Sequence, residues 1–101
     1  LFRSQRIVDI NHVYSNATVV DTLLKVAEKE VAEKIAARDI NYISNHLDYL
    51  VGKGDRLTAF DQMDMHTTVD SFNRYKEIAV TLDNKQLMAK IKRMDDRYFK
   101  N

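Results

Sequence analysis

Residues 52–55, Gly-Lys-Gly-Asp, decide the predicted fold, because they hold both glycines of the 101-residue chain. Glycine after a helical run is a common helix-end signal, since it adopts a left-handed backbone conformation without strain. Asp55 can cap a following helix by accepting hydrogen bonds from its first N–H groups. The stretch therefore predicts a turn between two helical halves of similar length, with Lys53 exposed in the turn.

The composition of the chain favours helices and excludes several other classes of protein. There is no proline and no cysteine, so most β-turn chemistry, disulfides and cysteine metal sites are ruled out. Apolar residues make up 45% and charged residues 31% of the chain, as in ordinary globular domains. No apolar run approaches the roughly twenty residues of a membrane span. We expect a single all-α domain over residues 1–101.

Apolar residues in the first half recur at intervals of three and four, which places them on one helix face. A first seam contains Ile10, Val13, Ala17, Val20, Leu24, Ala27 and Val31. A second seam, rotated by about 200° around the helix axis, contains Ala36, Ile40, Ile43, Leu47 and Leu50. No helix breaker separates the seams, so one long helix over about 4–51 is expected. The alternative is a break near Asp39, which can cap a new segment.

The second half shows the same spacing and predicts two further helices. Met65, Val69, Phe72, Tyr75, Ala79 and Leu82 indicate a helix over about 56–82. Asp83 and Gln86 resemble a capping box that starts a last helix over about 84–99. No strand-like alternation is present. The sequence therefore predicts a long antiparallel helical hairpin or a three-helix bundle with coiled-coil-like packing.

No motif in the sequence predicts catalysis, a cofactor or a metal site. The Glu-x-x-His and His-Glu-x-x-His patterns of helical metal sites are missing. The acidic cluster Asp61, Asp64, His66 and Asp70 is interpreted as a solvated helix face, because its ends lie on opposite sides of a helix. We therefore expect no enzymatic activity and no bound cofactor or metal.

His46 is the histidine with the most suggestive neighbours, because Tyr42 and Tyr49 lie one helical turn before and after it. These three residues form a polar–aromatic stripe beside the second seam. We expect the stripe to border the core or an interface, with its hydroxyl and imidazole groups reaching polar partners.

The predicted function is a helical protein–protein interaction or oligomerisation module, a subunit or adaptor of a larger assembly. A helix of about 48 residues would be roughly 70 Å long, and the second half of the chain is too short to cover it on two faces. Some apolar surface should then remain for a protein partner. The candidate interface is the end of the first seam, Val20, Leu24, Ala27 and Val31.

Two alternative functions remain open from the sequence. Residues 84–101 hold six basic and two acidic residues, whereas residues 55–83 hold three basic and six acidic residues. The basic last helix permits a nucleic-acid-binding accessory role, with contacts from Lys90, Lys92, Arg93, Arg97 and Lys100. The other alternative is a helical sensor domain cut from a membrane receptor, which a chain starting at Leu1 instead of Met allows.

Overall fold

The computed structural model describes the backbone of residues 2–99 and the side chains of residues 10–99. This part of the chain folds into α1 (Phe2–Lys25), α2 (Lys29–Val51), α3 (Ala59–Leu82) and α4 (Lys85–Tyr98). A short 3-10 turn, η1 (Gly54–Arg56), connects α2 and α3. No residue in the described range 2–99 belongs to a strand, so the predicted all-α fold is confirmed.

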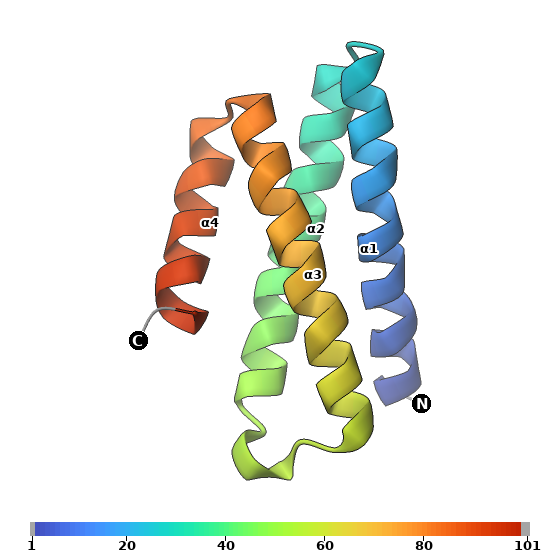
Figure 1. The fold of residues 1–101 in the computed structure, drawn as a ribbon, viewed down its shortest axis with the longest axis vertical. Helices are drawn as coiled ribbons and strands as arrows, with labels where there is room; N and C mark the ends of the chain where they lie inside the picture. Colours follow the sequence, from blue (N-terminus) through green and yellow to red (C-terminus); the bar gives the residue numbers. More distant parts are fainter. Residues whose placement is uncertain (1, 100–101) are drawn as a thin grey trace.

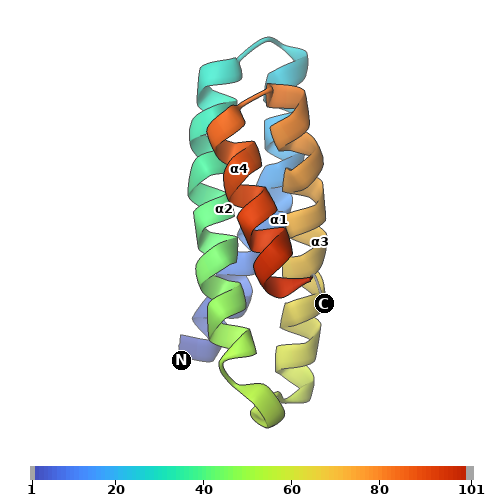
Figure 2. The ribbon, with the colours of Figure 1, turned by 90° about the vertical axis from the view of Figure 1, so that its left-hand side faces the viewer.

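The four helices form an up-down-up-down bundle centred on the antiparallel pair α2 and α3. α1 packs against both central helices on one side, and α4 packs against both on the other side (Figures 1 and 2). The radius of gyration is 13.7 Å, close to the value of about 13 Å expected for a compact domain of this length. The architecture is therefore a four-helix bundle in which α4, with 14 residues, is the shortest helix.

The prediction of one continuous helix over 4–51 is wrong, and so is the alternative break near Asp39, which lies inside α2. The chain reverses at Ala27, whose φ of 63° is left-handed. The N–H of Glu28 donates to the carbonyl of Leu23 at 2.9 Å, and the N–H of Ala27 donates to that of Leu24 at 3.2 Å. These paired bonds form a Schellman helix end, which usually has glycine at the left-handed position. Alanine stands there instead, so the sequence lacks the usual stop signal.

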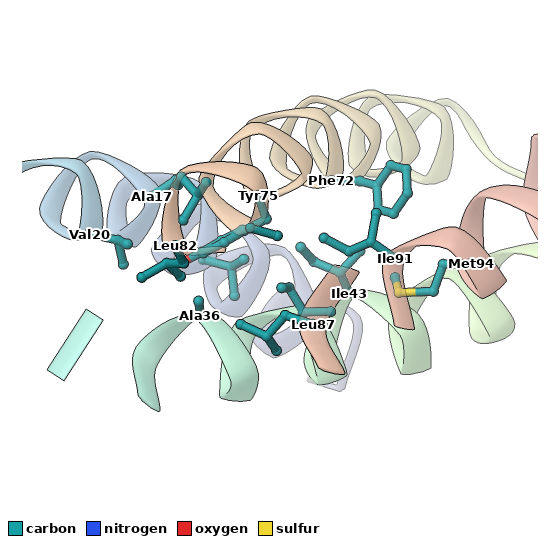
Figure 3. Packing of buried hydrophobic residues seen from close by; sticks show 14 of the residues in the cluster. Ala17, Val20, Ala36, Ile43, Phe72, Tyr75, Leu82, Leu87, Ile91 and Met94 are labelled. Atoms are coloured by element: carbon teal, nitrogen blue, oxygen red, sulfur yellow. The ribbon is translucent and has the colours of Figure 1, made fainter. Parts of the chain in front are cut away.

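The reversal at residues 26–28 explains why the two apolar seams are out of phase. The first seam is buried from Ile10 to Val20, and the second is buried throughout, from Ala36 to Leu50. Because α1 folds back against α2, both seams face the same core. The core is completed from α3 and α4 by Phe72, Tyr75, Ile78, Ala79, Leu82, Leu87, Ile91 and Met94, many of which are visible in Figure 3.

The turn between α2 and α3 lies where the glycines predict it, but a different residue caps the next helix. Gly52 has a helical φ of −63°, and Gly54 supplies the left-handed φ of 56°. Thr58, not Asp55, is the N-cap of α3: its hydroxyl accepts from the N–H of Asp61 at 3.1 Å. The Asp61 carboxylate accepts from the N–H of Thr58 at 2.9 Å, which completes a capping box.

The start of α4 also differs by one residue from the sequence prediction. Asp83 takes a left-handed φ of 51° at the end of α3, and Asn84 is the N-cap of α4. The Asn84 side chain accepts from the N–H of Leu87 at 3.1 Å and donates to the Glu33 carboxylate at 2.7 Å. One asparagine therefore starts α4 and ties it to α2.

Candidate functional site

The most unusual feature of the core is a buried histidine–aspartate pair that joins α2 to α3. His46 Nε2 lies 2.8 Å from Asp64 Oδ2, and the two side chains are 0% and 4% exposed. The rings of Tyr42 and Tyr49 stack beside the imidazole with centroid separations of 5.6 and 6.0 Å. The expectation that His46 borders the core and reaches a polar partner is confirmed.

One atom on each side of this pair has no hydrogen-bond partner: His46 Nδ1 and Asp64 Oδ1. We place a proton on His46 Nε2, because the Asp64 carboxylate 2.8 Å away can only accept a hydrogen bond. Nδ1 and Oδ1 are both closed to solvent. The His46–Asp64 pair therefore links α2 to α3, and it offers no proton donor or acceptor to the solvent.

A second buried carboxylate, Asp39, joins three helices. It accepts from the Tyr75 hydroxyl at 2.6 Å, from Asn16 Nδ2 at 3.1 Å and from Arg38 Nε at 3.3 Å. Burial and the bond to Asp39 raise the pKa of the Tyr75 phenol, so this hydroxyl remains a donor over the physiological range. α1, α2 and α3 therefore each contribute a side chain to one polar junction.

The third buried carboxylate, Asp61, anchors the turn between α2 and α3. Lys53 Nζ lies 2.8 Å from Asp61 Oδ2, with side-chain exposures of 14% and 2%, and 5.0 Å from the centroid of the Tyr49 ring. The bond from Lys53 and then the bond from the N–H of Thr58 lower the pKa of Asp61 to about 2. Lys53 is therefore an anchor of the turn and not the exposed residue that the sequence predicts.

The acidic cluster of α3 is split between the core and the surface. The interpretation as a solvated face is wrong for Asp61 and Asp64, which are 2% and 6% exposed. It holds for His66 and Asp70, whose exposed side chains lie 3.5 Å apart. The described side chains include no group of three or more His, Asp or Glu residues able to hold a metal ion.

The four residues predicted to bind a partner do not share one helix face. Val20 is fully buried inside the bundle, and Leu24 is partly buried against the same core. Ala27 forms the left-handed turn, and Val31 is 45% exposed on α2. The turn between α1 and α2 therefore divides the predicted seam, with Val20 and Leu24 on α1 and Val31 on α2.

The predicted polyanion contacts lie on two sides of α4. Lys90, Arg93 and Arg97 line an open groove with Ser44 and Met94, while Lys92 lies on the side facing α3. Two of these cations are engaged within the molecule: Lys90 donates to Asn41 at 2.7 Å, and Arg97 pairs with Asp48 at 3.1 Å. Lys100 lies outside the described residues.

A shallow apolar groove of about 230 Å³ runs between α3 and α4. Ala79, Val80, Met88 and Ile91 supply its apolar lining, and its charged lining residues are Lys76, Lys92 and Asp95. Val80 is 62% exposed and Met88 37% exposed, so the apolar surface is open to solvent from both helices. Spacing alone did not identify this groove, because it depends on how α4 packs against α3.

No protein-family model, curated protein or solved structure matches this chain. Within the described residues, no helix is both long enough and apolar enough to cross a bilayer.

Proposed function

We propose that this chain is a non-catalytic helical interaction module that self-associates through the groove between α3 and α4. The observation that carries the proposal is the exposure of Val80 and Met88 on neighbouring helices around one groove. Clustered apolar side chains are stabilised when association removes them from water.

The charges around the groove favour a second copy of the same chain as the partner. Lys76 and Asp95 form an ion pair at 3.0 Å, and Lys92 lies on the same rim. A two-fold dimer places the same patch on both subunits, so the patch must complement itself. An apolar centre bordered by both signs of charge meets this requirement.

The groove is held in a fixed shape by contacts that α4 makes with the rest of the bundle. Asn84 ties the start of α4 to Glu33, and the Tyr98 hydroxyl near its end donates its one hydrogen to Asp48, with the carbonyl of Ser44 as a second acceptor within reach at 3.2 Å. A preformed surface loses less conformational freedom on binding than a flexible one. Self-association therefore requires little reordering of α4.

The proposed interface lies away from the first seam. The long helix that would have left Val20 to Val31 uncovered does not exist, because α1 folds back onto α2. The support for an interaction module now comes from the groove between α3 and α4.

The test is the solution mass of the wild type, Val80→Asp and a matched control, Val19→Asp, measured by sedimentation equilibrium over a range of concentrations. Val19 is also an exposed helical valine, at 48%, but it lies on α1. We expect the wild type and Val19→Asp to dimerise, whereas Val80→Asp remains monomeric because it buries a charge. A monomeric wild type, or equal dimerisation by both variants, would contradict the proposal.

A further inference from the structure

An open cleft of about 390 Å³ lies between α1 and α2, away from the groove between α3 and α4. His12, Val13 and Asn16 line it from α1, and Arg38, Asp39 and Tyr42 line it from α2. Small-molecule sites commonly occupy roughly 300–1,000 Å³ and combine apolar surface with a few fixed polar groups. The cleft has both the size and the mixture of side chains that such a site needs.

Arg38 is the group in this cleft best placed to bind an anion. Its Nε donates to Asp39 Oδ1 at 3.3 Å, while 69% of the side chain remains exposed. Within the described part of the chain, its two Nη groups have no partner. The outer edge of a guanidinium presents two parallel N–H groups, which match the two oxygens of a carboxylate.

The position of Arg38 is supported by a buried network. Asp39, which holds Nε of Arg38, is itself fixed by Tyr75 and Asn16 from two other helices. The negative charge of Asp39 is thereby shared among three donors, and Nε of Arg38 is turned toward the protein. Asp39 and Tyr75 are therefore positioning residues, because they affect a bound anion only by holding Arg38 in place.

We propose that this cleft binds a small organic carboxylate. The carboxylate lies on the Nη edge of Arg38 with His12 nearby, and the apolar body of the ligand lies against the half-buried ring of Tyr42, above the buried Val13. The Tyr42 ring is what favours an organic acid over an inorganic anion, because it offers apolar surface that an inorganic anion cannot use.

The probe is benzoate, titrated into the isotopically labelled full chain and followed by NMR, with inorganic phosphate and chloride titrated at matched ionic strength. We expect saturable shifts of Val13 and Tyr42 with a dissociation constant of about 1 mM, as suits an open cleft. Arg38→Gln should weaken benzoate binding by about tenfold or more, because it removes the charged donor. Arg93→Gln, which removes an exposed arginine of α4, should leave the affinity unchanged.

Three results would overturn the proposal. The first is the absence of saturable benzoate shifts at concentrations well above 1 mM. The second is equal weakening by Arg38→Gln and Arg93→Gln, which would indicate a general charge effect. The third is phosphate binding as tightly as benzoate, which would show that the apolar lining of the cleft contributes nothing. Circular dichroism checks that both variants remain folded.

Discussion

Three buried carboxylates, Asp39, Asp61 and Asp64, fix how α2 and α3 meet. Each has a partner that the sequence could not assign, because the partner lies 8 to 36 positions away along the chain. The stripe around His46 was recognisable from its spacing, but its pairing with Asp64 required the fold. The Thr-x-x-Asp pattern at Thr58 was a readable local signal for the position of Asp61.

The buried His46–Asp64 pair should show strong energetic coupling. His46→Leu leaves a buried carboxylate without its partner and should lower the free energy of unfolding by about 3 kcal/mol. The double variant His46→Leu/Asp64→Leu should cost less than this single change, because no unpaired charge remains. Urea denaturation of the four proteins in the cycle measures the coupling.

The exposed pair His66–Asp70 provides the control for this cycle. Its side chains are 80% and 46% exposed, so the same leucine substitutions should change stability by at most about 0.5 kcal/mol. Additive effects at His46 and Asp64, or equal coupling in both pairs, would refute a structural role for the buried pair.

Acid should weaken the turn anchor Lys53–Asp61. The pKa of Asp61 is lowered from 3.8 to about 2 in the folded protein, so the unfolded state binds the proton more readily. The resulting stabilisation is present above pH 3.8 and is lost as the pH falls toward 2. Lys53→Ala should lower stability at neutral pH and flatten the pH dependence between these values. An unchanged pH profile in thermal denaturation would show that Lys53 does not anchor the turn.

At the scale of the elements, the three-and-four spacing was enough to predict helices and most of their buried faces. It failed at residues 26–28, where a left-handed alanine ends α1 without glycine or proline. The available signal was that the two seams are out of phase. We interpreted this as two faces of one continuous helix, whereas the chain in fact reverses direction. The caps at Thr58 and Asn84 also differ from Asp55 and Asp83, because several neighbouring polar residues can cap a helix equally well.

Ala27→Gly should stabilise the protein by about 0.5–1 kcal/mol, because it removes the strain of a left-handed alanine. Ala37→Gly is the control, because Ala37 is an exposed residue in the middle of α2. Glycine at that position should lower the free energy of unfolding by about 1 kcal/mol. Thermal denaturation should therefore shift the two midpoints in opposite directions. A lower midpoint for both variants would argue against the turn at Ala27.

For the whole molecule, the order of packing determines which surfaces remain available. α1 and α4 lie on opposite sides of the α2–α3 pair (Figures 1 and 2). The cleft beside Arg38, which α1 helps to line, and the groove beside Val80, which α4 helps to line, are therefore separate surfaces. Sequence spacing predicted the buried faces well but could not separate exposed apolar residues that cluster from those that are isolated. That distinction depends on the placement of α4 in three dimensions.

The most direct test of self-association is the distance between the two copies, which can be measured by pulsed electron paramagnetic resonance. The chain has no cysteine, so a single spin label can be placed at will. Lys85→Cys puts the label one turn before Met88, and Ser15→Cys puts it on α1, on the far side of the bundle. We expect an intermolecular signal for both labels, with the shorter distance at residue 85. No intermolecular signal, or a shorter distance at residue 15, would contradict self-association through the groove between α3 and α4.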